Sequence, residues 1–241
     1  MPETILLLTA TVRPQNMPNL ALTDPAERLR QYIAAATFWA GQPGIDRIIF
    51  GDNSGFDLSE IVSAAEKGGA KGRFQTISFD APPFDPKYGK GFGEMLILEK
   101  AVETCNEDST IVKVTGRLAV ANFADLLPGF QRNRRVTADL LNGLRRADAR
   151  LFSAKPWVLK ERLVPLKDQL DESQKVWMEH LLARAIHREL AEGGTWGPLE
   201  AWPDYRGYSG SAGTRLTEPI IKRAVLKLRH KVKNACYGEL P

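Results

Sequence analysis

One apolar segment near the N-terminus limits the folds open to this chain. Residues 5–12, ILLLTATV, are continuously apolar or β-branched, which is typical of a strand buried on both faces of a sheet. Asp24 and Pro25 then begin a helix, with the aspartate as N-cap and the proline at the first helical position. Further strands are predicted at 46–50, 74–79 and 110–115, and further helices at 58–67 and 94–105. This alternation with short connections predicts an α/β fold with a mostly parallel central sheet flanked by helices.

The second half of the chain is less regular. Segments 134–140 and 149–158 are predicted to extend the sheet in mixed orientation. Residues 171–174, Asp-Glu-Ser-Gln, have the form of a capping box, and six glycines lie within 191–215. A last helix begins at about Thr217, so we expect a helical C-terminal part. The helix behind the capping box is predicted to bury Met178, Leu181, Leu182, Ala185 and Ile186.

Composition excludes several classes of protein. A chain of 241 residues that is 43% hydrophobic can bury a sizeable core, so wholesale disorder is excluded. The 33 Lys and Arg exceed the 29 Asp and Glu by only four, whereas a dedicated nucleic-acid binder usually has a denser basic stripe, so we expect no specific nucleic-acid partner. Cys105 and Cys236 lack zinc-ligand spacing and are expected to be idle thiols in a reducing compartment. The longest apolar run is too short to span a bilayer, so we expect a cytoplasmic protein.

Four segments, at 9–13, 52–55, 87–94 and 115–117, are expected at the carboxyl ends of the strands, where ligands bind in such sheets. Residues 51–55, GDNSG, can hydrogen-bond a ribose or a base, or simply form a turn. Residues 87–94, KYGKGFGE, can cradle a phosphate or form a flexible loop. Residues 113–117, KVTGR, combine a cation, a hydroxyl and a bidentate donor, or form a charged strand end. Neither G-x-G-x-x-G nor a P-loop occurs, which disfavours a Rossmann dinucleotide site or an ordinary ATPase.

Taken together, these segments resemble a known family. LLLTATVRP, RLRQY, DRIIFGDNSG, GKGFGE and VKVTGRLAVAN, in this order and spacing, are similar to bacterial polysaccharide-assembly glycosyltransferases of the GT-A type, which build capsule or lipopolysaccharide chains. The similarity covers roughly residues 4–125 and continues more weakly through DARLFS and WMEHLLARAI. It implies a single GT-A-like domain over 1–241, with a nucleotide-sugar-binding half at 1–125 and an acceptor-binding half at 126–241.

The resemblance implies a nucleotide-sugar donor above the strand ends and a growing surface polysaccharide or lipid-linked glycan as acceptor. The implied donor-binding residues form three groups: one beside the nucleotide, one near its base or ribose, and one at the end of the fourth strand and in the glycine-rich segment, whose cations face the diphosphate or the acceptor. The groups are Thr9, Ala10 and Arg13; Asp52, Asn53 and Ser54; and Lys90, Lys113, Thr115, Gly116 and Arg117.

The sequence departs from the common GT-A pattern because it contains no Asp-x-Asp. In the usual enzymes that pair holds a divalent cation that neutralises the leaving diphosphate. We expect lysine and arginine to take over this task without a cofactor, while isolated carboxylates leave a less obvious metal site open. His180 and His187 lie on nearly the same helix face but lack a third ligand, so solvated histidines are expected there.

An inverting transfer needs a base that takes the proton of the acceptor hydroxyl. Glu179, at the edge of the apolar stripe in WMEHLL, is the first candidate, because the resembling family often shows a Glu there. An ordinary surface glutamate is the alternative. Asp139, in the strand-like VTADL, is the second candidate.

Aromatic and basic residues near the C-terminus suggest where the acceptor and a membrane would bind. Trp196, Trp202, Tyr205 and Tyr208 can stack on sugar rings, or they can pack on the core. The terminal helix has an apolar stripe of Ile221, Val225, Leu228 and Val232, flanked by six Lys or Arg with no acidic residue among them. Segment 217–233 suits peripheral contact with an anionic membrane and equally suits docking on the core with a solvated polar face, and we expect it to do both.

The sequence supports a glycosyltransferase first and leaves two other functions open. A nucleotidyltransferase acting on sugar phosphates needs the same sheet and phosphate-binding loops, but it releases pyrophosphate. A non-catalytic module that binds glycan or nucleic acid would use the aromatic segment and the basic helix. Steeply salt-dependent binding of random nucleic acid would favour the module, whereas saturable binding of nucleotide sugars would favour an enzyme.

Overall fold

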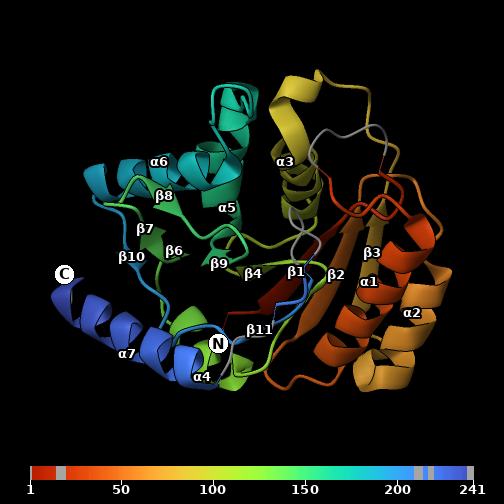
Figure 1. Ribbon diagram of the computed structural model, residues 1–241, viewed down its shortest axis with the longest axis horizontal. Helices are drawn as coiled ribbons and strands as arrows, with labels where there is room; N and C mark the ends of the chain where they lie inside the picture. The colour runs from red at the N-terminus through yellow and green to blue at the C-terminus, as the bar shows by residue number, and fades with distance from the viewer. Residues whose placement is uncertain (1, 15–19, 209–213, 217–219, 238–241) are drawn as a thin grey trace.

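The computed structural model describes residues 2–14, 20–208, 214–216 and 220–237, and it confirms the predicted α/β architecture. A seven-stranded sheet forms the centre, in the order β10-β6-β9-β4-β1-β2-β3 (Figure 1). Four neighbouring strands are parallel and match the four strands predicted in the first half of the chain. They are β1 (Thr4–Ala10), β2 (Arg47–Asp52), β3 (Phe74–Ser78) and β4 (Thr110–Thr115).

The other side of the sheet has mixed orientation, as predicted. β9 (Leu151–Ala154) runs antiparallel to β4, and β6 (Val136–Thr137) runs antiparallel to β9. β10 (Trp196–Gly197) pairs parallel with β6 at the edge. The strand predicted at 134–140 is thus much shorter, because the chain leaves the sheet after Thr137 and enters a hairpin. Two small antiparallel ribbons complete the strands: β7 (Leu140–Leu141) with β8 (Arg146–Ala147), and β5 (Leu118–Val120) with β11 (Tyr205–Gly207).

Helices cover both faces of the sheet because the side chains of β1 alternate between two cores. Ile5 and Leu7 belong to the core beneath α3 and α6, whereas Leu6 and Leu8 belong to the core beneath α1, α2 and α4. Each of these four side chains is 0% exposed. The helices are α1 (Pro25–Ala40), α2 (Ser59–Ala65), α3 (Gly89–Val102), α4 (Phe123–Phe130), α5 (Pro156–Val158), α6 (Met178–Ala191) and α7 (Ile220–Tyr237).

Helix α1 begins where the sequence predicts it. The Asp24 carboxylate accepts hydrogen bonds from the backbone N–H groups of Ala26 and Glu27, and Pro25 is the first helical residue. Helix α3 begins five residues earlier than predicted, at Gly89 rather than Glu94. The glycine-rich segment is therefore the first turn of a helix.

Helix α6 begins later than predicted, and the capping box at 171–174 is wrong. Asp171 closes a turn by accepting hydrogen bonds from the N–H groups of Ser173 and Gln174. The helix starts at Met178, and the His180 ring accepts a hydrogen bond from the Trp177 N–H at 3.2 Å. The predicted apolar face is nevertheless confirmed, because all five of its residues are buried.

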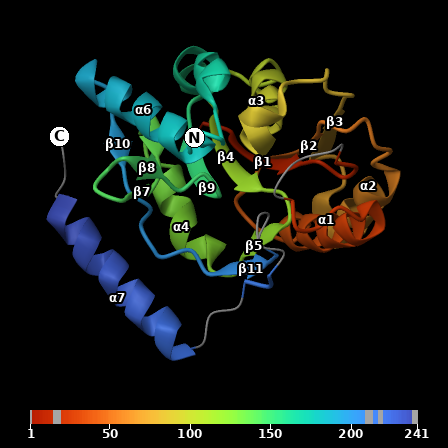
Figure 2. The ribbon, with the colours of Figure 1, turned by 45° about the horizontal axis from the view of Figure 1, so that its top comes forward.

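The last helix, α7, is attached to the body through polar side chains. His230 is 5% exposed, and its Nε2 lies 3.0 Å from Oδ2 of Asp139. Arg223 forms an ion pair with Asp204 at 3.2 Å, and the amide of Asn234 donates to a backbone carbonyl at 2.6 Å. Figure 2 shows α7 lying along the outside of the molecule, next to α4.

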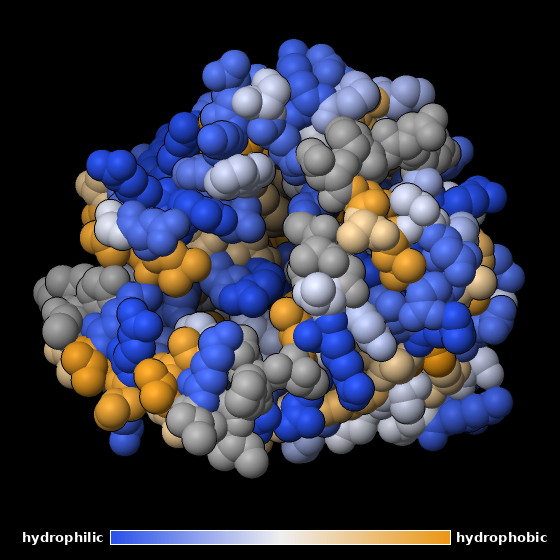
Figure 3. All heavy atoms as spheres, in the orientation of Figure 1, coloured by the Kyte–Doolittle hydropathy of each residue, from blue (hydrophilic) through white to orange (hydrophobic). Residues whose placement is uncertain are grey.

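The described part of the apolar stripe of α7 faces away from the body. Val225 is 49% exposed, Leu228 65% and Val232 58%, while the side chain of Ile221 lies outside what the structure describes. In the space-filling view, apolar atoms gather over α7 at the lower left (Figure 3). The expectation that this stripe docks on the core is therefore wrong for the described side chains. Among the helices that the structure describes, none combines the length and the apolar composition needed to cross a membrane.

Candidate active site

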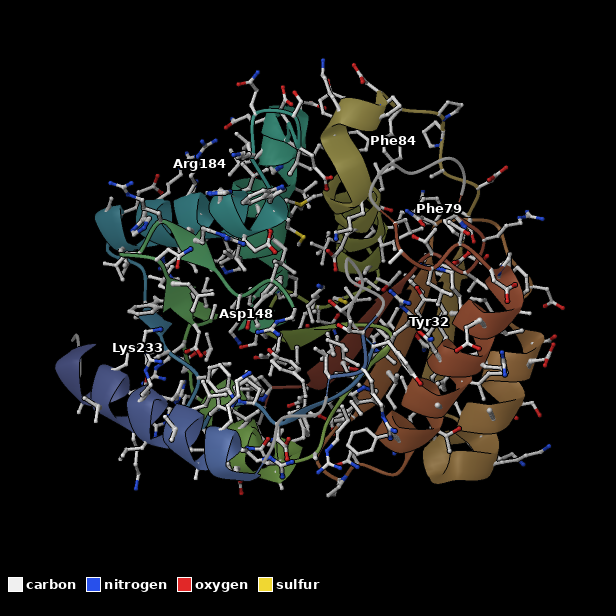
Figure 4. The ribbon with its side chains drawn as sticks, viewed as in Figure 1. Tyr32, Phe79, Phe84, Asp148, Arg184 and Lys233 are labelled. Carbon is white, nitrogen blue, oxygen red and sulfur yellow. The ribbon has the colours of Figure 1, made fainter. Side chains whose placement is uncertain are left out.

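Three cavities lie at the carboxyl ends of the parallel strands. The β1 cavity, about 100 Å³, is bounded by Thr9, Ala10, Arg28, Tyr32 and Arg117. The β2 cavity, about 210 Å³, is bounded by Thr11, Arg13, Asn53, Ser54 and Phe84. The central cavity, about 490 Å³, extends from α3 to α6 and includes Arg146, Trp177 and Glu179. In Figure 4, Tyr32 on α1 and Asp148 next to β9 lie on opposite sides of the centre of the molecule.

The cavities adjoin one another, since they share lining residues. Lys90, Glu94 and Thr115 line both the β1 cavity and the central cavity. Thr11 lines both the β1 cavity and the β2 cavity. The β1 cavity therefore lies between the other two.

The wall between the β1 and central cavities contains a buried ion pair. Lys113 is 0% exposed, and its ammonium contacts Oε1 of Glu94, which also accepts a hydrogen bond from the Thr9 hydroxyl at 2.7 Å. The ammonium donates further to the carbonyl of Ala149 at 2.6 Å and contacts the Thr115 hydroxyl at 3.4 Å. Lys113 thus holds Glu94 in the wall of the site and does not itself line the cavities.

Two buried arginines face the β1 cavity. Arg28 and Arg117 are each 4% exposed, and neither forms an ion pair within the described part of the chain. Arg28 donates to Thr11 O at 2.7 Å, and Arg117 donates to the neutral amide oxygen of Gln31 at 3.0 Å. Burial lowers the pKa of Arg117, and the nearby Arg28 lowers it further. A pair of desolvated cations without counter-charges favours an anionic ligand.

Gly116 allows this arrangement because it brings the end of β4 against the end of β1. Its N–H donates to Thr9 O at 2.9 Å. A Cβ atom on Gly116 would lie only 2.6 Å from that same carbonyl oxygen. The glycine therefore sets where Arg117 enters the β1 cavity.

The GDNSG turn is organised from within by Asp52. This carboxylate is 0% exposed and accepts hydrogen bonds from the backbone N–H groups of Val12, Ser54 and Phe56. Asp52 therefore shapes the turn, while the next residue faces the β2 cavity. Asn53 accepts a hydrogen bond from the Thr11 hydroxyl at 2.6 Å and lines that cavity.

Two other residues predicted to bind the nucleotide-sugar donor lie at the cavity rims. The Arg13 backbone N–H donates to the Ser54 hydroxyl at 3.0 Å. The Arg13 side chain is exposed and lines the β2 cavity. Lys90 is exposed on the first turn of α3 and lines the wall shared by the β1 and central cavities. The structure thus places the predicted donor-binding residues around these cavities, apart from Asp52 and Lys113, which face inward.

The central cavity contains Glu179, the first candidate for the base. Its carboxylate lies 3.9 Å from the Arg146 guanidinium, which is positioned over the Trp177 ring at 4.9 Å. The Arg146 Nε is buried and has no hydrogen-bond partner among the described residues. The cavity therefore offers a carboxylate, a cation and an aromatic ring together.

A second arginine of the central cavity is fixed by a buried carboxylate. Arg150 binds Asp148 through two hydrogen bonds of 2.9 and 2.7 Å and lies over the Tyr205 ring at 4.3 Å. Burial opposes ionisation of Asp148, but Arg150 outweighs it and holds the pKa of this carboxyl below its usual value. Burial also raises the pKa of the Tyr205 hydroxyl, which donates to Asp148.

Asp139, the second candidate for the base, lies in a different place from Glu179. It is 2% exposed, pairs with His230 of α7 and accepts a hydrogen bond from the Leu199 N–H. It lines neither the β1 cavity nor the central cavity. These contacts give Asp139 a role in attaching α7.

The four predicted acceptor-binding aromatics are not brought together. Trp196 is 7% exposed and donates to the carbonyl of Ala138, and Tyr205 is buried beneath Arg150. Trp202 packs against His230 at 6.0 Å, and Tyr208 lines a further cavity beside α1 that shares Arg117 with the β1 cavity. The aromatic ring of the central cavity is instead Trp177.

Sequence reasoning assigned no role to several residues of these cavities, among them Arg28, Glu94, Arg146, Arg150 and Trp177. Trp177 precedes Glu179 by two residues, and this spacing could have predicted an aromatic ring near the candidate base. Glu94 closes the GKGFGE segment, but only the structure shows its pairing with Lys113. Within the described residues, no group of three or more His, Cys, Asp or Glu side chains is placed to hold a metal ion.

Comparisons with known proteins show similarity only at the level of structure. No family model matches the chain, and no curated protein matches its sequence. The galactosyltransferase LgtC, solved with donor and acceptor sugar analogues, is 14% identical over 80% of this chain and 73% of its own, with a TM-score of 0.49.

Two nucleotidyl-transferring enzymes show comparable similarity. A cytidylyltransferase from Leptospira borgpetersenii is 14% identical over 93% of this chain and 84% of its own, with a TM-score of 0.48. A nucleoside-diphosphate-sugar pyrophosphorylase from Vibrio cholerae is 12% identical over 81% of this chain and 91% of its own, with a TM-score of 0.47. Similarities of this size establish no activity for the chain, so its function has to be inferred from its own cavities.

Proposed function

We propose that this protein is a glycosyltransferase that moves a sugar from a nucleotide-sugar donor to a growing surface polysaccharide or lipid-linked glycan. One observation supports this most: two adjoining cavities share a wall, and their chemistry differs. The β1 cavity offers desolvated arginines, which suit a diphosphate, whereas the central cavity offers Glu179 and Trp177, which suit a sugar hydroxyl and a sugar ring.

In this proposal the donor occupies the β2 and β1 cavities. Asn53 and the turn held by Asp52 bind the nucleoside, and Arg28 and Arg117 bind the phosphates. The cations then neutralise the leaving group, which is the task of a divalent ion in other enzymes. We accordingly expect donor binding to persist in the presence of EDTA.

The acceptor occupies the central cavity. Its hydroxyl oxygen attacks the anomeric carbon of the donor, the bond to the phosphate oxygen breaks, and the electron pair leaves with the nucleotide. Glu179 takes the proton of the attacking hydroxyl. Trp177 and Arg146 orient the acceptor sugar.

Product analysis tests the proposed function. Purified protein is incubated with UDP-, GDP- and CMP-sugars or with nucleoside triphosphates and sugar phosphates, each with a panel of glycan acceptors, and the released nucleotides and pyrophosphate are quantified. Release of nucleoside di- or monophosphate that requires acceptor supports a glycosyltransferase. Pyrophosphate release from a triphosphate would identify a nucleotidyltransferase, and binding of glycan without turnover of any donor would identify a binding module.

We further propose that α7 holds the protein at the inner face of the cytoplasmic membrane. The outward apolar residues Val225, Leu228 and Val232 can enter the lipid interface, and exposed cations such as Lys227 and Lys231 on the same helix can contact anionic headgroups. The contact between His230 and Asp139 holds the helix against the rest of the protein. A lipid-linked acceptor would be reached from this surface.

Vesicle sedimentation tests the membrane contact. Wild-type protein should sediment with phosphatidylglycerol-containing vesicles and less with pure phosphatidylcholine. Leu228→Glu should reduce binding at least tenfold, because a fully buried leucine contributes about 1.5–3 kcal/mol. Leu144→Glu, at the exposed tip of the β7–β8 hairpin, is the control. Unchanged binding of Leu228→Glu would contradict the contact.

A further inference from the structure

Glu94 is the carboxylate that lines both the β1 cavity and the central cavity, at the boundary between the two proposed substrates, together with Lys90 and Thr115. We infer that Glu94 is a catalytic carboxylate that faces the transferred sugar and stabilises the positive charge developing on it. This inference rests on the proposed glycosyl transfer and assigns a residue to the reacting centre. It is distinct from the base, which is assigned to Glu179 on the opposite side of the central cavity.

The contacts of Glu94 hold one oxygen and leave the other available. Oε1 receives both the Thr9 hydroxyl at 2.7 Å and the Lys113 ammonium. Within the described residues no donor reaches Oε2, and the side chain is 21% exposed where it lines both cavities. A ligand that passes from one cavity to the other therefore meets an oriented carboxylate oxygen.

The buried ammonium of Lys113 holds this carboxylate in place. The ammonium is 0% exposed, and Glu94 is the only carboxylate that reaches it among the described residues. A buried ammonium without a counter-charge is strongly disfavoured, so the contact between Lys113 and Glu94 stabilises the position of both side chains. The ion pair thus fixes the Glu94 carboxylate at the wall that the two cavities share.

The backbone around Glu94 is fixed by the close packing of α3. A Cβ atom on Gly93 would lie 2.3 Å from the amide nitrogen of Asn53, and one on Gly91 would lie 3.4 Å from Met178. The first turn of α3 is therefore fitted between the β2 turn and α6. This packing places the Glu94 carboxylate within the shared wall and limits its freedom to move.

Glycosyl transfer creates the kind of charge that such a group stabilises. As the bond between the anomeric carbon and the phosphate oxygen breaks, the sugar acquires oxocarbenium character. The electron pair leaves with the nucleotide toward Arg28 and Arg117, and the acceptor oxygen forms the new bond while Glu179 takes its proton. The Glu94 carboxylate forms and breaks no bond in this step and lowers its barrier electrostatically.

The test compares Glu94→Gln with the wild-type protein in the donor and acceptor assay. We expect kcat to fall at least 100-fold, while the dissociation constant of the donor, measured by calorimetry, changes less than threefold. Glu99→Gln is the matched control, because Glu99 is on the same helix and pairs with Lys167 at 2.7 Å outside these cavities. It should keep kcat within twofold.

A second pair of variants separates catalysis from folding. Glu94→Gln leaves Lys113 buried without a counter-charge, so the change is repeated in a Lys113→Met background, where no buried charge is left unpaired. Glu94→Gln/Lys113→Met should be at least 100-fold slower than Lys113→Met, at equal melting temperature. Equal kcat in either comparison would overturn the role of Glu94 alone. A wild-type protein that turns over no nucleotide sugar would instead overturn the proposed function, and this inference with it.

Discussion

The two walls of the site lie at different halves of the sheet, and they differ in whether their arginines have carboxylate partners. On the parallel half, between β1, β4 and α1, Arg28 and Arg117 are each 4% exposed and have no carboxylate partner among the described residues. On the antiparallel half, below α6, Arg150 is bound by Asp148, and Arg146 lies 3.9 Å from Glu179. One wall has unbalanced cations, and the other has cations balanced by carboxylates.

The difference indicates which substrate each wall meets. Desolvated cations without carboxylate partners are costly in the free protein and gain most from a phosphate, so the parallel wall suits the nucleotide. The Arg146–Glu179 contact is long and partly exposed, so polar groups can rearrange it, and the antiparallel wall suits a hydroxyl-rich acceptor. Four substitutions test this difference between the two walls.

The largest effect is expected from Glu179→Gln. As general base, this carboxylate should contribute about 10²–10⁴-fold to turnover, so kcat should fall by at least 100-fold. Donor affinity measured by calorimetry should stay within threefold, because Glu179 belongs to the acceptor wall. Glu192→Gln, at the far end of α6, serves as control. Retained turnover of Glu179→Gln would remove this residue from the mechanism.

Arg117→Met should weaken donor binding, whereas Glu179→Gln should lower turnover. Loss of a charge-assisted bond worth about 1.5–3 kcal/mol should weaken donor binding roughly tenfold or more. The melting temperature of the ligand-free protein should remain or rise, because a buried, unpaired cation is removed. Arg132→Met, at an exposed pair with Glu200, should change neither quantity. A lower melting temperature with unchanged donor affinity would show that Arg117 is structural.

Gly116→Ala tests how tightly the two parallel strand ends must approach. The added Cβ would lie 2.6 Å from Thr9 O, so the backbone must move. The free energy of unfolding in urea should drop by about 1–3 kcal/mol, and donor binding should weaken with it. Gly41→Ala, whose Cβ would meet no atom nearer than 3.7 Å, should be much milder. Equal effects would show that the close approach is not required.

Asp148 tests the balanced wall through pH. Its pKa is lowered in the folded protein, so the stabilisation is complete above the unfolded value of about 3.8 and is lost as pH falls through the lower folded value. Asp148→Asn should therefore show a flatter dependence of unfolding free energy on pH below about 4 than the wild-type protein. Urea unfolding at several pH values measures this slope, and identical slopes would contradict the pairing with Arg150.

Regular elements of the first half were predictable because local signals and packing agree there. The run of β1 is apolar on both faces since helices cover both, and the Asp24–Pro25 start of α1 is a purely local device. The start of α3 was not predictable in this way. Its glycines indicate a loop when considered alone, and only their close contacts with Asn53 and Met178 explain a helix.

The site was predictable where residues directly follow strands, as with Asn53 and Arg117. It was not predictable where a partner is distant in sequence: Glu94 meets Thr9 across 85 residues, and Asp139 meets His230 across 91. Aromatic residues near 200 show a related difficulty. Composition does not distinguish a ring that packs on the core, such as Trp196, from one that faces a cavity.

The most direct test of the account is calorimetric titration of UDP-, GDP- and CMP-sugars into the wild-type, Arg117→Met and Glu179→Gln proteins in EDTA. We predict that at least one of these nucleotide sugars binds the wild-type protein saturably without a metal. That affinity should fall roughly tenfold or more in Arg117→Met, in line with the lost charge-assisted bond, and should be kept in Glu179→Gln. Binding of no donor, or equal affinity in wild type and Arg117→Met, would contradict the assignment of the parallel wall to the nucleotide.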